Sequence, residues 1–349
     1  MSEDFEKRVL RNTVFLIARA DGVNNELIQD LVRVRFYIEK RITDAPDFQS
    51  RFRAKQIAAE LEKTLSALYT RWGYLLTDET RHAVNAVSSN ESALFSKSFS
   101  VQPDDFYSLP VATLDNLVSK PIGGKTLSSW ASTWSASQSK VVKRVLFEAI
   151  TEGLGAADAA KKLRESGALS FGRAQSSTVA RTVMLQAANG AREDMLETHK
   201  TYIKAYRYVA TLDSRTCLIC SPYDGRTRKT RSELPNLLRH LSCRCTVLPW
   251  DKELVAPTDT RPAVLHDSSV VRHQDGSTET KRKVREVEQV GITTTYQQWF
   301  DSLAPSEKLQ ILGRGRYDLY AKGSLTLKAF ATPQRIKSIH ELKKAIGSD

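Results

Sequence analysis

The residues best suited to chemistry are four cysteines and one histidine in a short window of the chain. Cys217 and Cys220 form a Cys-x-x-Cys pair, and nineteen residues separate this pair from the group His240, Cys243 and Cys245. A Cys-x-x-Cys turn presents two thiolates to one tetrahedral ion, and the second group adds sulfur and an imidazole nitrogen. Such ligands suit zinc. The sequence therefore predicts one Zn2+ ion, with Cys243 and Cys245 as alternatives for the fourth ligand.

Two other states of these thiols remain open from the residues alone. Cys217 and Cys220 can form a redox dithiol, or the cysteines can stay unliganded. A thioredoxin-like dithiol needs a strand–helix–strand context, which the surrounding sequence lacks. A disulfide scaffold would spread its cysteines through a small secreted chain, so their clustering favours a reducing, intracellular site of expression.

The zinc is expected to be structural rather than catalytic. A catalytic ion keeps one coordination position open for water, usually beside an acid or a base. Here the candidate ligands are sulfur-rich and numerous enough to close the site. Asp213 and Asp224 flank the window, but turns commonly place aspartate at such positions. We therefore assign no catalytic residue.

Helical patterns dominate the elements that must position this window. Apolar residues recur at helical spacing over residues 4–42, 51–88, 127–152, 156–166 and 173–199. A turn is expected at 20–25, and a polar, serine-rich segment follows at 88–100. Residues 202–212 have the composition of a strand. The predicted fold class is mainly α with a small α+β zinc-binding module, a helical N-terminal region and an extended basic C-terminal arm.

These patterns divide the chain into five segments. We predict a helical docking region (1–120), a second helical part (121–200), the zinc-binding α+β module (201–256), a polar basic linker or arm (257–289) and a small C-terminal segment (290–349). No apolar run approaches the ~18–20 residues that span a bilayer. The charged N-terminus leads into no secretory segment. We therefore expect no membrane partner.

The charge of the chain is uneven. With 52 basic and 40 acidic side chains the net charge is +12, of which residues 196–349 carry +9 (26 basic and 17 acidic). A basic surface of this kind suits a polyanion, most commonly nucleic acid, although it can also be simply solvated. The candidate nucleic-acid contacts are Arg226, Arg228, Lys229, Arg231, Lys281, Arg282, Lys283 and Arg285.

The cysteine window resembles the phage Mu F-like minor head proteins, also called the phage head morphogenesis family. Members typically carry D-x-R-T-C-x-x-C-x-x-x-D-G followed by H-P-x-C-R-C, and residues 213–225 and 240–245 follow this pattern. The helix containing Arg181 and Thr182 is similar to the family's Ala-Arg-Thr helix. The resemblance covers roughly residues 120–325. Leu241 replaces the usual proline, and Val183 stands where an acidic residue often occurs.

The resemblance implies a structural minor capsid protein of a tailed phage, present in few copies. It would be assembled in the host cytoplasm and lie in the virion, at the portal vertex or in the head interior. The implied partners are the portal protein, other head proteins and packaged double-stranded DNA, with no small-molecule substrate. The implied protein is not an enzyme.

Two other function classes compete with this interpretation. A zinc-containing nuclease of the His-Asn-His type also combines Cys-x-x-Cys with histidine, but no adjacent Asp-His pair and no downstream array of asparagine and histidine is present. His266 and His273 lie in the predicted arm, where we expect them to be solvated. A host DNA-binding regulator would need a recognition helix, and none is apparent.

Overall fold

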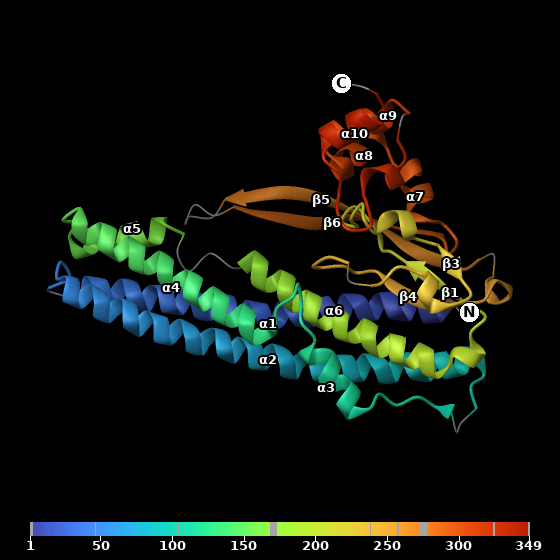
Figure 1. Cartoon of the computed structure of the whole chain (residues 1–349), viewed down its shortest axis with the longest axis horizontal. Coiled ribbons are helices and arrows are strands. Elements are labelled where there is room, and N and C mark those ends of the chain that lie inside the picture. Colours follow the sequence, from blue (N-terminus) through green and yellow to red (C-terminus); the bar gives the residue numbers. More distant parts are fainter. Residues whose placement is uncertain are drawn as a thin grey trace.

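The structure, a computed structural model, describes residues 3–45, 47–102, 105–167, 173–237, 239–256, 258–272, 278–323 and 325–347. In this part of the chain ten α-helices surround two three-stranded sheets, so the predicted mainly helical class is confirmed (Figure 1). No helix among these residues is both long and apolar enough to cross a bilayer.

Two long helices, α1 (Glu3–Thr43) and α2 (Arg51–Phe99), run side by side along the molecule (Figure 1). The expected turn at 20–25 is wrong, because Ala20 and Asn24 are buried on the inner face of a continuous helix. The serine-rich segment 88–100 is also helical almost to its end. Serine hydroxyls there bond back to the helix, as Ser89 Oγ does to the Asn85 carbonyl (2.9 Å).

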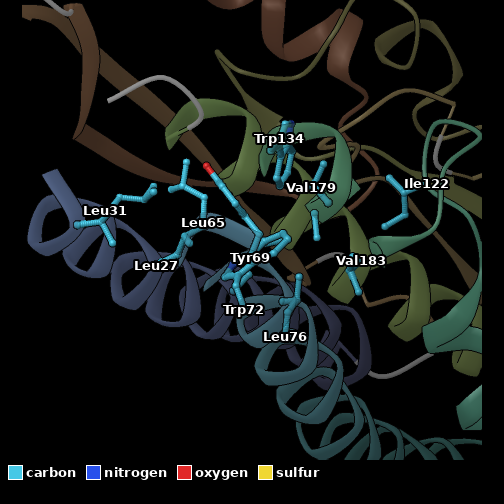
Figure 2. Close-up of a cluster of buried hydrophobic side chains, with 14 of the residues drawn as sticks. Leu27, Leu31, Leu65, Tyr69, Trp72, Leu76, Ile122, Trp134, Val179 and Val183 are labelled. Atoms are coloured by element: carbon cyan, nitrogen blue, oxygen red, sulfur yellow. The ribbon is translucent and has the colours of Figure 1, made fainter. Parts of the chain in front are cut away.

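Four more helices complete the helical part. The four are α3 (Val111–Ser119), α4 (Leu127–Thr151), α5 (Ala156–Glu165) and α6 (Arg173–Thr198). The last three confirm the helices predicted at 127–152, 156–166 and 173–199 to within one residue at each end. Their core is rich in aromatic rings, with the Trp134 ring centroid 5.4 Å from that of Trp72 and 6.0 Å from that of Tyr69 (Figure 2). Leu27, Leu65 and Val183 extend this core (Figure 2).

The two sheets follow α6 in the chain. In the first, β1 (Ala205–Val209) pairs antiparallel with β3 (Thr227–Arg228) on one side and β4 (Thr246–Trp250) on the other. In the second, β2 (Leu212–Asp213) pairs parallel with β5 (Thr260–Arg272). The predicted strand at 202–212 therefore contains all of β1 and the start of β2. Short 3₁₀ helices lie between these elements: η2 (Lys200–Tyr202), η3 (Ser221–Tyr223), η4 (Arg231–Glu233) and η5 (Lys252–Leu254). A further one, η6 (Leu327–Phe330), lies between the last two helices of the chain.

The linker predicted at 257–289 is instead mainly a long β-hairpin. Strand β5 pairs antiparallel with β6 (Thr278–Gly291), with an irregularity between Leu265 and His266. Valines and threonines give β6 a strand preference that its many charges concealed. His266 is not solvated as expected: its side chain is buried, and Nδ1 lies 3.2 Å from Ser214 Oγ. His273 lies outside the described residues.

Four short helices form the C-terminal segment and cover the end of the second sheet (Figure 1). They are α7 (Tyr296–Ser302), α8 (Pro305–Leu312), α9 (Arg314–Ala321) and α10 (Ile339–Ala345). Their core, which includes Trp299, Phe300 and Leu342, joins Leu212 and Leu218 beside the cysteine window. On another side, Phe5 of α1 packs into the core that contains Cys220 and Cys243. The cysteine window is therefore held between the two ends of the chain.

Candidate metal centre

The candidate ligands come from two loops that meet beside the first sheet. The backbone amides of Cys220 and Ser221 both donate to the Cys217 carbonyl (3.1 and 3.0 Å), which makes the tight turn of the Cys-x-x-Cys pair. The second loop precedes β4 and brings His240 Nε2 to 2.8 Å from Cys217 Sγ and 3.4 Å from Cys220 Sγ. It also places Cys243 Sγ 3.8 Å from Cys220 Sγ. The structure thus brings together the residues that the sequence predicted.

The ligand atoms form two overlapping groups. Those of Cys217, Cys220 and His240 lie within 4.8 Å of one another, and so do those of Cys220, Cys243 and Cys245. All four cysteines are free of disulfides. Zinc–sulfur and zinc–nitrogen bonds of about 2.3 and 2.0 Å give tetrahedral edges of about 3.8 Å between sulfurs and about 3.5 Å between sulfur and nitrogen. The contacts that Cys220 makes with Cys243 and His240 are close to these edges.

The two alternatives for the fourth ligand have different surroundings. Cys243 makes the 3.8 Å sulfur contact with Cys220. Cys245 lies within 4.8 Å of the same sulfur but also against the buried side chain of Tyr208. Cys243 also hydrogen-bonds to His240, which favours it as the fourth ligand, while both cysteines fall in the group with Cys220 and neither in the group with Cys217 and His240.

The histidine ring has the orientation of a zinc ligand. Its Nδ1 lies 2.8 Å from the Leu241 carbonyl, which fixes the proton on Nδ1 and leaves the Nε2 lone pair toward the sulfurs in the neutral ring. Without a cation, hydrogen bonding to Cys217 and Cys243 raises the pKa of His240 to about 10. The hydrogen bond with Cys220 lowers the pKa of Cys217 to about 5, against the opposing effect of burial. Metal binding is therefore expected to displace protons from the cluster.

Helix α6 holds the second ligand loop, a role that the sequence analysis missed. Thr182 Oγ1 accepts from the Ser242 amide (2.8 Å), where Ser242 has a left-handed φ of 58°. Asn189 Nδ2 donates to the Cys245 carbonyl (3.1 Å), and Arg192 Nη1 donates to Thr246 Oγ1 (2.6 Å). Thr182, Asn189 and Arg192 are seven and three positions apart and share one helix face, and this spacing was the available signal.

Arg192 extends this support to the long helices through a buried ion pair. Its Nε and Nη2 donate to the two carboxylate oxygens of Glu91 on α2, at 2.7 and 2.8 Å. The side chains are 3% and 2% exposed. Asn12 of α1 donates to the same carboxylate (2.9 Å). Three helices and the start of β4 are therefore joined through one fully partnered polar network.

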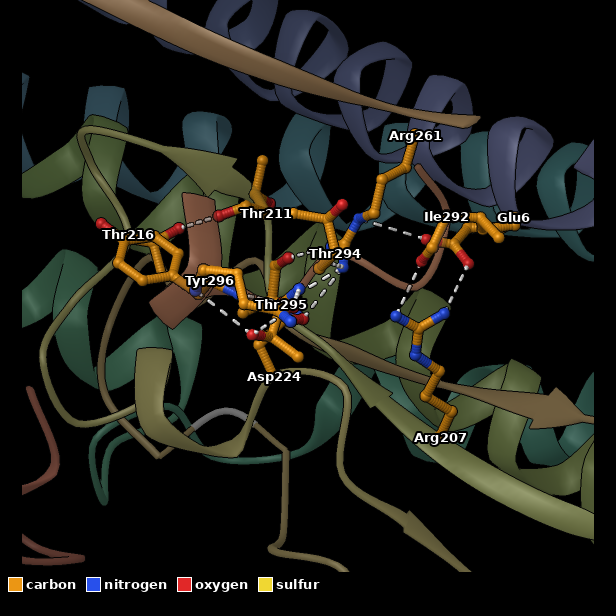
Figure 3. Close-up of polar contacts among 12 residues, drawn as sticks. Glu6, Arg207, Thr211, Thr216, Asp224, Arg261, Ile292, Thr294, Thr295 and Tyr296 are labelled. Carbon is orange, nitrogen blue, oxygen red and sulfur yellow. Dashed lines mark hydrogen bonds and ion pairs between the residues drawn. The ribbon is translucent and has the colours of Figure 1, made fainter. Parts of the chain in front are cut away.

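Both aspartates that flank the cysteine window are buried and saturated with protein partners. Asp213 pairs with Arg244, whose guanidinium holds the pKa of this carboxyl below its usual value, although burial, the largest effect, opposes this. Asp224 accepts from the backbone amides of Ala210 and Tyr296, both at 2.7 Å, and from Arg261 Nη1 at 3.1 Å (Figure 3). Asp224 thus ties the cysteine window to β5 and α7.

The first turns of α1 join this polar cluster. Glu6 lies 3.4 Å from Arg261 Nε and 3.7 Å from Arg207 Nη1, and all three side chains are at most 1% exposed (Figure 3). Burial raises the pKa of Glu6, while both arginines act against that shift. The positive charges of Arg207 and Arg261 are thus matched by the negative charges of Glu6 and Asp224, and the four residues come from three distant parts of the chain.

The predicted nucleic-acid contacts fall into three groups. Arg228, Lys229 and Lys283 are exposed and form no ion pair with other described residues. Arg231 and Arg285 pair with Glu193 and Glu307, respectively, and Arg226 lies over the Tyr223 ring at 4.6 Å from its centroid. The backbones of Lys281 and Arg282 belong to β6, but their side chains lie outside the described part. The described side chains come from two separate segments, residues 226–231 and strand β6.

Comparison with known proteins gives one result. The family model described as phage Mu protein F like protein matches residues 140–248, which include α6 and all five candidate ligands. Neither the curated proteins nor the solved structures contain a significant match. Residues 140–248 are therefore similar to the phage Mu protein F-like family, the family that the cysteine window resembles.

Proposed function

We propose that the chain is a structural minor head protein of a tailed phage, built around a structural zinc ion. The observation that carries this proposal is the family match, whose range contains the candidate metal centre. Membership of the family supports a role in head morphogenesis and a place in the virion. The portal protein and packaged DNA are the proposed partners. The long α1–α2 pair, with exposed Phe52 and Tyr74 on α2, is the proposed docking region.

The position of the chain in the particle tests this function directly. We expect mass spectrometry of purified phage particles to detect the chain in tail-free heads, in a copy number far below that of the major capsid protein. Cross-linking within these heads should join the helical region 1–120 to the portal protein. A chain that is absent from purified heads would contradict the proposed function.

We propose that zinc is held by Cys217, Cys220, His240 and Cys243, while Cys245 remains a buried thiol behind the site. The tetrahedral edges at Cys220 and the Nδ1 contact of His240 support this assignment. The zinc would fix two loops that have little regular structure of their own. Zinc-dependent folding of such small modules is general, because the ligands gather only in the folded state.

Packaged DNA would be contacted through phosphate neutralisation by exposed lysines and arginines. If Arg228, Lys229 and Lys283 each neutralise one phosphate, raising the salt from ~50 to ~200 mM should weaken binding about 40-fold. We expect the full chain to bind duplexes of unrelated sequence equally well in fluorescence anisotropy. Replacing Arg228 and Lys229 by alanine should lower the slope of log affinity against log salt concentration by the amount expected for two phosphate contacts.

The matched control for this measurement is Lys63→Ala, which removes an exposed lysine on α2, far from the basic loop in sequence. This variant should keep the salt dependence of the unchanged chain. Equal effects of the two replacements would show that the loop has no special part in DNA binding, and a chain that does not bind DNA at low salt would exclude the contact.

The alternative of a His-Asn-His nuclease finds no specific support in the site. His240 faces the thiols and the buried His266 contacts Ser214, so neither points toward an open carboxylate site. Cleavage of plasmid DNA that depends on a divalent metal, and is lost when Cys217 and Cys220 are replaced, would favour this alternative.

A further inference from the structure

The outer face of α1 is exposed along its N-terminal half. Leu16, Ala20 and Leu27 are buried on the inner face. Arg11, Phe15, Ala18, Gly22 and Glu26 follow one another at intervals of three or four residues on the opposite face, and all five are exposed. The Phe15 side chain is 44% exposed. This row therefore offers one bulky apolar residue, two small residues and two opposite charges, with the exposed Arg8 and Arg19 beside it and Arg19 paired with Glu79.

The charges of this face have no ion-pair partner among the residues that the structure describes. Neither Arg11 nor Glu26 forms an ion pair with another described residue. Fifteen residues separate them, which is about 22 Å along a helix, so they cannot reach each other within one molecule. The basic residue lies toward the N-terminal end of the face and the acidic residue toward its C-terminal end.

Gly22 leaves a shallow space on the same face. A β-carbon at Gly22 would meet nothing within 4 Å, so packing within the chain does not require glycine there. Glycine weakens a helix interior relative to alanine, because it adds freedom to the unfolded chain. The missing side chain does allow a bulky group from outside to approach the backbone closely.

We propose that a second copy of this chain docks antiparallel on this face, with the twofold axis beside Ala18. A residue of one helix then lies at the same height as the partner residue whose number makes the sum of the two numbers 37. Phe15 faces the partner's Gly22, and Arg11 faces the partner's Glu26. The twofold axis repeats each contact, so two phenyl rings fill two glycine spaces and two ion pairs form. Ala18 allows the helices to approach closely at the centre.

This self-association is separate from the metal centre. It uses α1 of the proposed docking region, but not the exposed Phe52 and Tyr74 of α2. The contact involves a single helix from each copy. It therefore buries less than the about 800 Å² per partner that is typical of stable complexes. The dimer is weak and depends on protein concentration, and opposite charges at both ends of the face set its antiparallel register.

Sedimentation velocity of the full chain at increasing concentration tests the proposal. We expect a reversible monomer–dimer equilibrium. Arg11→Glu and Glu26→Arg should each raise the dimer dissociation constant about tenfold or more, because each replaces two attractions by two repulsions. Mixing these two variants should restore association, since each then supplies the charge that the other needs. The double variant should dimerise with itself.

Control variants separate this contact from general effects of charge or stability. Lys63→Glu reverses an exposed charge on α2 and should leave the equilibrium unchanged. Gly22→Leu should raise the thermal stability of the monomer and weaken the dimer, because the leucine occupies the space for Phe15. A chain that is monomeric at every accessible concentration would overturn the proposal. So would single variants that dimerise normally, or that fail to associate when mixed.

Discussion

Replacing Cys217 and Cys220 together by serine is expected to remove the bound zinc and to unfold the region 205–250. Structural zinc sites contribute about 10–16 kcal/mol to the folding of their modules, and two of the four proposed ligands are lost here. Elemental analysis should fall from one zinc per chain to none. Limited proteolysis should open the loops at 211–245, while the circular dichroism of the long helices should largely persist.

Single cysteine variants define the ligand set and serve as controls for this result. Cys243→Ala should lose zinc, whereas Cys245→Ala should retain one zinc per chain, because Cys245 contacts Tyr208 behind the site. Both positions are buried in the same core, so the volume lost is the same. Zinc loss in Cys245→Ala alone would assign the fourth position to Cys245. An unchanged chain that contains no zinc under reducing conditions would contradict the centre itself.

The cluster of cysteines and histidine was predictable because its members are close in sequence and chemically distinctive. Cys-x-x-Cys and His-x-x-Cys-x-Cys each fit into one loop, so residue type and spacing carried the prediction. The choice between Cys243 and Cys245 depends instead on how the loop turns at Ser242, whose left-handed backbone is held by Thr182 of α6. Sequence spacing within the loop carries no information about that distant contact.

Local propensity was misleading where packing decided the structure. The segment 20–25 has the composition of a turn, but α1 continues through it because Ala20 and Asn24 pack inside the helical part. The many charged residues likewise concealed the strand preference of β6. This strand pairs with β5 and needs few apolar residues to do so. In both cases the neighbouring element supplied contacts that no local window contains.

The supports of the site were the least predictable part. Asp224 was interpreted as a turn residue, yet it accepts from Arg261 and from the Tyr296 amide, 37 and 72 residues further along the chain. Glu6, at the start of α1, approaches Arg207 and Arg261 in the same cluster. Such pairs follow from the topology, and a single sequence does not show which charges will meet.

Arg192→Met should destabilise the chain by about 3–5 kcal/mol, because it leaves the Glu91 carboxylate buried without its cation. That is a large share of the about 5–15 kcal/mol that holds a typical domain folded. Urea unfolding followed by circular dichroism should show the midpoint moving to lower denaturant. Glu91→Gln combined with Arg192→Met should recover part of the loss, because no uncompensated buried charge then remains.

Arg181→Met on the same helix is the matched control for this loss. Arg181 also pairs with a carboxylate of α1, that of Asp21 at 2.7 Å, but these side chains are 29% and 33% exposed. Water can solvate Asp21 after the replacement, so the expected cost is about 1 kcal/mol or less. The difference between the two losses in unfolding free energy measures the effect of burying the ion pair, because the helix, the residue type and the substitution are the same. Equal losses would show that the buried Arg192–Glu91 pair stabilises the packing of α6 on the long helices no more than the partly exposed Arg181–Asp21 pair does.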